Sequence, residues 1–90
     1  MSARPHFIFN ALDLGRAIRA ERRALGKTQA ELARDANCRR QTIGDLEAGR
    51  NVSIQTLMAV LGGLGKRLIL ADARPSMDDM HLLLDPDNED

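Results

Sequence analysis

The chain has 90 residues, of which 43% are apolar and 29% charged, and this composition is typical of one ordinary globular domain. A single cysteine excludes an internal disulfide, two histidines add no metal-ligand spacing, and no apolar run approaches the roughly 18 residues that span a membrane. The net charge of zero is unevenly spread. Residues 1–74 hold all 13 Lys and Arg against seven acidic residues, whereas residues 75–90 hold six acidic residues and no basic one. A basic body is typical of nucleic-acid binding, and a separate acidic tail remains solvated or meets another protein.

The chemistry-bearing side chains are too few for a catalytic site. Cys38, His6 and His81 are far apart in the sequence, and with the scattered acids they form no nucleophile–base pair, metal set or cofactor loop. We therefore expect no enzymatic activity, no cofactor and no metal, with both histidines on the surface. Phe7 and Phe9 are the only aromatic residues, too few to stack on unpaired bases, so duplex DNA is the favoured nucleic acid. The first residues lack the apolar core of a signal peptide, which favours a cytoplasmic protein.

The first helix is predicted at residues 11–25. Asn10 stands at its N-cap position with Asp13 three residues later, and Gly26 supplies a left-handed stop. Apolar residues recur at helical spacing and predict one inward face. That face consists of Leu14, Ile18 and Leu25, with Ala17 and Ala24 beside them.

Two short helices joined by a tight turn follow. Residues 28–31 form a complete capping box, which opens a helix at residues 29–36. Asn37 tolerates the left-handed conformation of a tight turn, and Cys38 is expected to plug the space beneath it. A third helix is predicted at residues 40–48. The inward residues of this pair are Leu32, Ala33, Ala36, Ile43 and Leu46, and Gly49 ends the second of the two helices. These offsets indicate a helix-turn-helix, which directs the start of its second helix into a major groove.

A fourth helix is predicted at residues 54–61, with Ser53 as its N-cap. The glycines of residues 62–65 are predicted to end this helix in an exit turn. A phosphate-binding loop would need a strand before it and a helix after it, and the sequence predicts neither here. Residues 66–73 are rich in β-formers and predict one short strand, with Leu68, Ile69 and Leu70 as its dimer contacts. A lone strand needs a ladder partner, and the same strand of a second copy gives a two-fold homodimer.

The predicted organisation has four parts: an N-terminal arm at residues 1–10, a helix-turn-helix domain at 11–65, a dimerisation strand at 66–74 and an acidic tail at 75–90. Phe7-Ile8-Phe9 in the arm is expected to staple the first helix and cover the core, with an edge strand as the alternative. The tail carries five large apolar residues, Met77, Met80, Leu82, Leu83 and Leu84. They predict docking on a partner, a short helix packed on the protein's own dimer, or a degradation-prone tail.

Residues 14–61 resemble the lambdoid-repressor-like (XRE) helix-turn-helix proteins. The resemblance rests on Gln29, Leu32-Ala33, the small Cys38, Ile43, Leu46-Glu47 and Gly49. Within that family, Leu14 to Arg22 and the exit from Leu64 to Ala73 are most similar to HipB-type antitoxins. The resemblance implies an all-α, compact domain of four to five helices, with a short C-terminal strand that pairs across a homodimer.

The same resemblance implies a function. A HipB-type antitoxin represses its own type II toxin–antitoxin operon and binds a HipA-like kinase toxin. Two alternatives stay open: a phage-like repressor without a toxin partner, and a toxin-neutralising interaction module whose DNA contact is secondary. For any of these repressors, two recognition helices related by a two-fold axis are expected to read a palindromic operator.

The resemblance also assigns roles to individual residues. Gln29 corresponds to the phosphate-contacting Gln of the family, and Arg22 and Glu47 correspond to an internal ion pair between the first and third helices. The leading turn of the third helix supplies the expected base readers, Arg40, Gln41 and Thr42. Arg39, Arg50 and Asn51 are placed to meet the phosphate backbone. Asp45 is left outside this site, as a carboxylate that either accepts from cytosine or turns away.

Overall fold

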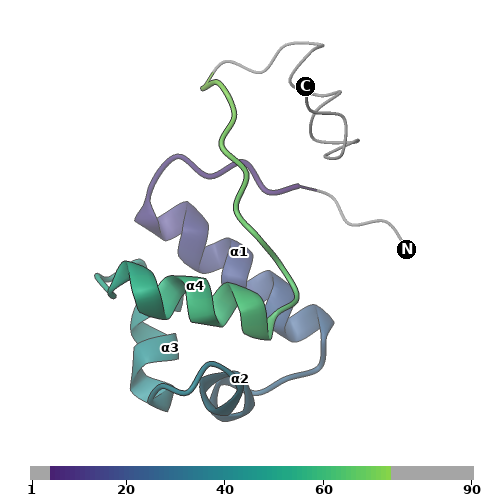
Figure 1. Cartoon of the computed structure of the whole chain (residues 1–90), viewed down its shortest axis with the longest axis vertical. Coiled ribbons are helices and arrows are strands. Elements are labelled where there is room, and N and C mark those ends of the chain that lie inside the picture. Colours follow the sequence, from purple (N-terminus) through teal and green to yellow (C-terminus); the bar gives the residue numbers. More distant parts are fainter. Residues whose placement is uncertain (1–4, 74–90) are drawn as a thin grey trace.

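The computed structural model describes residues 5–73, and its helices lie where the sequence predicts them. The four helices are α1 (Ala11–Ala24), α2 (Gln29–Asp35), α3 (Arg40–Glu47) and α4 (Ile54–Gly63), as Figure 1 shows. Every predicted boundary lies within two residues of the observed one. The all-α prediction is confirmed with four helices in the described range. None of these helices has the length and hydropathy needed to cross a membrane.

Local capping explains three of the four helix starts. Asn10 accepts a hydrogen bond from the amide of Asp13 through its side-chain oxygen at 2.8 Å, so α1 begins at the next residue. The predicted capping box opens α2, where Thr28 accepts from the amide of Glu31 at 3.1 Å and Glu31 accepts from that of Thr28 at 2.8 Å. Ser53 caps α4 in the same way. The fourth start differs, because the residue before α3 makes no capping hydrogen bond with its side chain.

The core lies between the helices and contains most of the predicted inward residues. Its fully buried side chains are Ile18, Leu32, Ile43 and Val60. Cys38 is half-buried and packs against this cluster, as predicted for the plug beneath the turn, and burial raises the pKa of its thiol. The predictions for Ala24 and Leu25 are wrong, since Ala24 is exposed and the Leu25 side chain is half exposed. Because α1 ends at Ala24, Leu25 is its C-cap and no longer follows the inward helical face.

At Gly15 the backbones of α1 and α3 come into direct contact. A Cβ atom built on this glycine would lie 2.5 Å from the carbonyl oxygens of both Leu46 and Glu47. Only a residue without a side chain permits this approach. Gly15 therefore sets how closely α3 lies against α1, and with it the position of the α3 surface.

The turn between α2 and α3 directs α3 outward. Asn37 has a φ of 56°, the left-handed conformation predicted for it, and the amide of Cys38 donates to the carbonyl of Ala33 at 2.9 Å. Figure 1 views α2 nearly along its axis, whereas α3 runs close to the plane of the picture, so the two helices cross steeply. Arg40 and Gln41, in the first turn of α3, are exposed.

The segments before α1 and after α4 differ from the prediction. Residues 5–10 and 66–73 contain neither helix nor strand. Phe7 and Phe9 are more than half exposed, so the arm neither covers the core nor forms an edge strand in the single chain. The predicted strand at 66–74 is likewise absent from residues 66–73, because a strand needs a ladder partner and the described part of one chain supplies none. The acidic tail at 75–90, with its Met and Leu residues and His81, lies outside the described residues.

The Glu21 carboxylate of α1 contacts both the arm before α1 and the segment after α4. The side-chain oxygens of Glu21 contact Nε2 of His6 in the arm at 2.8 Å and Nζ of Lys66 after α4 at 3.3 Å. The hydrogen bond from His6 is the largest influence on Glu21, and with that of Lys66 it holds the pKa of this carboxyl below its ordinary value. His6 is on the surface as predicted, but it is fastened to α1. Figure 1 shows the segment after α4 running back past the arm, away from α2 and α3.

Candidate nucleic-acid interface

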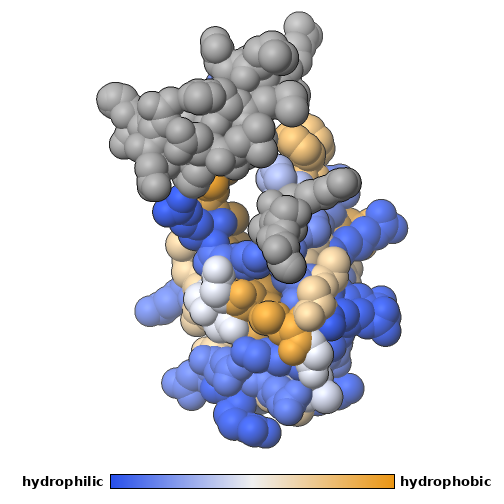
Figure 2. All heavy atoms as spheres, turned by 90° about the vertical axis from the view of Figure 1, so that its right-hand side faces the viewer, coloured by the Kyte–Doolittle hydropathy of each residue, from blue (hydrophilic) through white to orange (hydrophobic). Residues whose placement is uncertain are grey.

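The leading turn of α3 presents polar side chains to solvent. Arg40 and Gln41 are exposed and Thr42 is half-buried, while Ile43 and Leu46 lie in the core. Burial of the inner face therefore fixes which side chains point outward. Figure 2 views the molecule from the side opposite α3 and shows a mainly hydrophilic lower end there. The three predicted base readers follow one another at the start of α3.

The two arginines at the start of α3 keep their charges available. Arg39 and Arg40 are exposed, and within residues 5–73 neither guanidinium forms an ion pair. Arg39 occupies the N-cap position without capping the helix, so its side chain is not drawn back to the backbone. Two neighbouring guanidinium groups at this position can bind phosphate or guanine, because both accept hydrogen bonds from a guanidinium.

The loop after α3 places Arg50 and Asn51 on the surface, as predicted. Arg50 is held by Asp45: its Nη1 lies 3.3 Å from Oδ1 of Asp45, and its amide donates to the Asp45 carbonyl at 2.8 Å. The sequence places Asp45 outside the predicted site, whereas in the structure it lies beside Arg50, a predicted phosphate contact. The five-residue separation across a helix end gave no spacing rule that could have found this pair.

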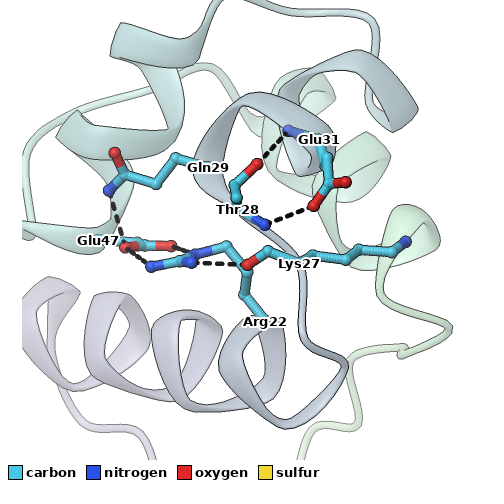
Figure 3. A network of polar contacts seen from close by, with 6 residues as sticks. All are labelled: Arg22, Lys27, Thr28, Gln29, Glu31 and Glu47. Carbon is cyan, nitrogen blue, oxygen red and sulfur yellow. Dashed lines mark hydrogen bonds and ion pairs between the residues drawn. The ribbon is translucent and has the colours of Figure 1, made fainter.

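A buried polar network supports the site from behind, as Figure 3 shows. Arg22 of α1 and Glu47 of α3 meet in a two-point ion pair, with Nε to Oε2 at 2.6 Å and Nη2 to Oε1 at 3.1 Å. Their side chains are only 11% and 5% exposed. Arg22 also donates from Nη1 to the carbonyl oxygen of Lys27 at 2.8 Å. The structure thus brings together the two residues that the resemblance pairs, and the pair joins α1 to α3.

Gln29 extends this network to α2. Its Nε2 donates to Oε1 of Glu47 at 3.1 Å, so the first residue of α2 is tied to the last residue of α3. Eighteen positions separate the two residues and no motif couples them, so the sequence alone does not predict this link. Gln29 is half-buried. Its amide has a second N–H, which leaves a donor for an external acceptor while the bond to Glu47 is kept.

The network keeps both Glu47 and Arg22 ionised. Burial is the largest influence on Glu47 and raises its pKa, but hydrogen bonds from Arg22 and Gln29 and the charges of Arg22 and Arg19 outweigh it, so the pKa ends below its ordinary value. The hydrogen bond to Glu47 is the largest influence on Arg22 and raises the pKa of the guanidinium. At neutral pH the ion pair is therefore intact, and it fixes α1, α2 and α3 relative to one another.

The fold and this surface define a class of protein. The helix-turn-helix family model matches residues 18–70, so the chain belongs to the helix-turn-helix family. It is accordingly a DNA-binding domain and not an enzyme.

Solved structures narrow the likeness to HipB. The chain is similar to one from a complex of a HipB variant with an O2 20mer, at 30% identity and a TM-score of 0.71, over 81% of this chain and 100% of that chain. A HipB–O4 20mer complex is 29% identical over 74% and 96% of the two chains, with a TM-score of 0.70. A HipA–HipB–O2–O3 complex is 28% identical over the same shares, with a TM-score of 0.69. No curated protein sequence matches the chain.

Proposed function

We propose that this protein is a sequence-specific transcriptional repressor that reads a palindromic DNA operator as a homodimer. We further propose that it is the antitoxin of a type II toxin–antitoxin operon, which it autoregulates, and that it binds a HipA-like kinase toxin. The observation that carries the DNA part is the exposed leading turn of α3, supported from behind by the buried Arg22–Glu47–Gln29 network. The toxin part is supported by the likeness to HipB, which one solved structure contains together with HipA.

Base reading is assigned to Arg40, Gln41 and Thr42. A guanidinium pairs with O6 and N7 of guanine, a glutamine amide with N6 and N7 of adenine, and a threonine methyl meets the methyl group of thymine. Phosphate contact is assigned to Gln29, Arg39, Arg50 and Asn51, which fix the register of the domain without reading sequence. Cationic phosphate contacts supply much of the affinity and make it fall as salt rises.

The DNA proposal is tested by fluorescence anisotropy with the duplex upstream of the protein's own gene, beside a scrambled duplex, at two salt concentrations. Preferential binding to the first duplex that weakens with salt is the expected result. Equal and weak binding to both duplexes would reject a sequence-reading repressor and favour the interaction module.

The antitoxin proposal is tested with the product of the neighbouring gene. A kinase-like protein that forms a stable complex with the purified chain in size-exclusion chromatography supports it. A neighbour without kinase features, combined with specific DNA binding, would leave a phage-like repressor.

Arg40→Ala and Gln29→Ala are expected to affect DNA binding differently. Arg40→Ala removes a base contact from an exposed side chain, so it costs about 1–3 kcal/mol on the operator and relaxes preference at one base pair, with unchanged stability. Gln29→Ala weakens operator and random duplexes alike, because its role is positioning, and it also lowers stability through the lost bond to Glu47. Arg16→Ala, an exposed arginine of α1, is the control for loss of one charge. Equal losses on both duplexes for Arg40→Ala would reject its assignment.

The homodimer proposal predicts that Leu70→Asp dissociates the dimer. Leu70 is 95% exposed in the single chain, so a charge there leaves the protomer fold intact but is costly inside a strand pair of two copies. Ile54→Asp, at a 77% exposed position on α4, is the matched control. Sedimentation velocity is expected to show a monomer for Leu70→Asp and a dimer for Ile54→Asp. The reverse result would place the interface on α4.

A further inference from the structure

Helix α1 carries a row of arginines that neither the core nor the proposed DNA contact uses. Residues three and four positions apart are neighbours on a helix, so Arg16, Arg19 and Arg23 lie on one face, which we call the arginine face. All three are exposed, and within residues 5–73 none of them forms an ion pair. Like charges at this spacing destabilise a helix, so an anion bound beside them would stabilise α1.

The carboxylates of the described residues do not neutralise the arginine face. Arg19 lies near enough to Glu47 for its charge to act on that carboxylate, yet both oxygens of Glu47 are bonded to Arg22 and Gln29. Glu21, also in α1, is engaged by the arm and by the segment after α4. An anion that suits this face must therefore come from outside residues 5–73.

The acidic tail, residues 75–90, has the composition of such an anion. It contains no Lys or Arg, and its acidic residues are Asp78, Asp79, Asp85, Asp87, Glu89 and Asp90. Five large apolar residues stand among them. The arginine face offers apolar surface as well, because Leu12 is 46% exposed one turn before Arg16 and the stems of arginine side chains are apolar. The tail thus complements this face in both charge and hydropathy.

The course of the chain brings the tail to α1. Lys66 contacts Glu21 of α1 where the segment after α4 begins, and Figure 1 shows this segment running away from α2 and α3. Fully extended, residues 75–90 span up to about 50 Å, whereas α1 is about 20 Å long. Tethering gives the tail an effective concentration on the order of 1 mM at a surface within reach. An untethered acidic partner has no such advantage.

We propose that the acidic tail docks on the arginine face of its own chain and shields this face from other polyanions. Exposed ion pairs are individually weak and are screened by salt, so docking depends on several carboxylates together and is reversible. A docked tail keeps the phosphates of unrelated nucleic acid away from α1 and removes a sequence-independent contribution to binding. The inference goes beyond the proposed repressor function and depends on neither the operator nor a toxin.

Paramagnetic NMR on the full chain tests the docking. His81→Cys in a Cys38→Ala background carries a nitroxide in the middle of the tail, and amide peak intensities are compared before and after reduction of the nitroxide. Peaks of residues 16–23 are expected to lose most of their intensity. They are expected to regain it at high salt, and in a variant with three substitutions, Arg16→Gln, Arg19→Gln and Arg23→Gln.

The matched control removes three exposed arginines from the other end of the molecule, by Arg34→Gln, Arg39→Gln and Arg40→Gln. This control is expected to keep the full loss of intensity in α1. A loss on α3 in place of α1, a loss that persists in the α1 variant, or no loss anywhere would overturn the proposal. So would a loss that appears only when the nitroxide is carried by a second copy of the chain.

Shielding is tested separately with a random duplex at low salt. Four tail substitutions, Asp78→Asn, Asp79→Asn, Asp85→Asn and Asp87→Asn, are expected to raise the affinity several-fold. The rise is expected to vanish when the three α1 substitutions are present. A rise of equal size with and without them would show that the tail acts only through net charge and would reject the shielding, as would an unchanged affinity. Melting temperatures of all variants check that the fold is kept.

Discussion

Glu47→Ala is expected to destabilise the domain by about 3–5 kcal/mol, because it leaves the Arg22 guanidinium buried without its counter-charge. Both side chains are almost fully inaccessible, and two hydrogen bonds join them. The substitution also removes the acceptor of Gln29. Small domains are stable by only about 5–15 kcal/mol in total, so this single change uses up a large part of the free energy of unfolding. Urea unfolding followed by circular dichroism measures the loss.

A double replacement separates the charge from the shape of the pair. Arg22→Met combined with Glu47→Leu removes both charges and keeps most of the volume, and such exchanges are often neutral or stabilising. We therefore expect the double variant to be clearly more stable than Glu47→Ala or Arg22→Ala. If the double variant loses as much stability as the two single alanine variants together, the unpaired charge is not the cause of their destabilisation.

The same carboxylate makes stability depend on pH. The pKa of Glu47 is lower in the folded chain than the ordinary value of 4.5, so its contribution is complete above that value and is lost as the pH falls through the folded pKa. Glu21 and Glu31 have lowered pKa values as well and act in the same direction. Stability is thus expected to fall below about pH 4.5, and to fall less steeply in Glu47→Gln, which has no proton to bind at this position.

The helix boundaries could be predicted because their signals are local. Asn10, Thr28 and Ser53 each accept a hydrogen bond from an amide three residues later, so their effect is visible in a few letters of sequence. Leu25 shows where such reasoning fails. Helical periodicity assigns a face only to residues inside the helix, and Leu25 is one position past the end of α1.

The contacts that support the site join residues from different parts of the chain, and the sequence alone does not show which residues pair. Gln29 reaches Glu47 from another helix, Arg50 reaches back to Asp45 across the end of α3, and each of these contacts depends on how the helices cross. The Arg22–Glu47 pair was expected only through resemblance to a family. The arm is predicted to cover the core or form an edge strand, and residues 66–74 to pair as a strand with a second copy, whereas within residues 5–73 of one chain Glu21 fastens both segments by ion pairs.

Gly15→Ala is expected to destabilise the domain by about 3 kcal/mol, although alanine is the better helix former. The new methyl carbon would lie 2.5 Å from two carbonyl oxygens of α3. Both obstacles are backbone atoms, so no side-chain rotation relieves the clash and α3 must move away from α1. The movement stretches the Arg22–Glu47 bonds and shifts the reading face, so DNA affinity is expected to fall together with the melting temperature.

Gly62→Ala provides the matched control for this clash. Gly62 also lies inside a helix, but a Cβ atom there meets nothing within 4 Å. Its replacement is therefore expected to be neutral or to stabilise by up to about 1 kcal/mol. If α1 and α3 meet backbone to backbone, thermal unfolding will show a lower melting temperature for Gly15→Ala and an equal or higher one for Gly62→Ala. A Gly15→Ala variant as stable as Gly62→Ala would show that the two helices are farther apart, and the position of α3 would then depend on the buried ion pair alone.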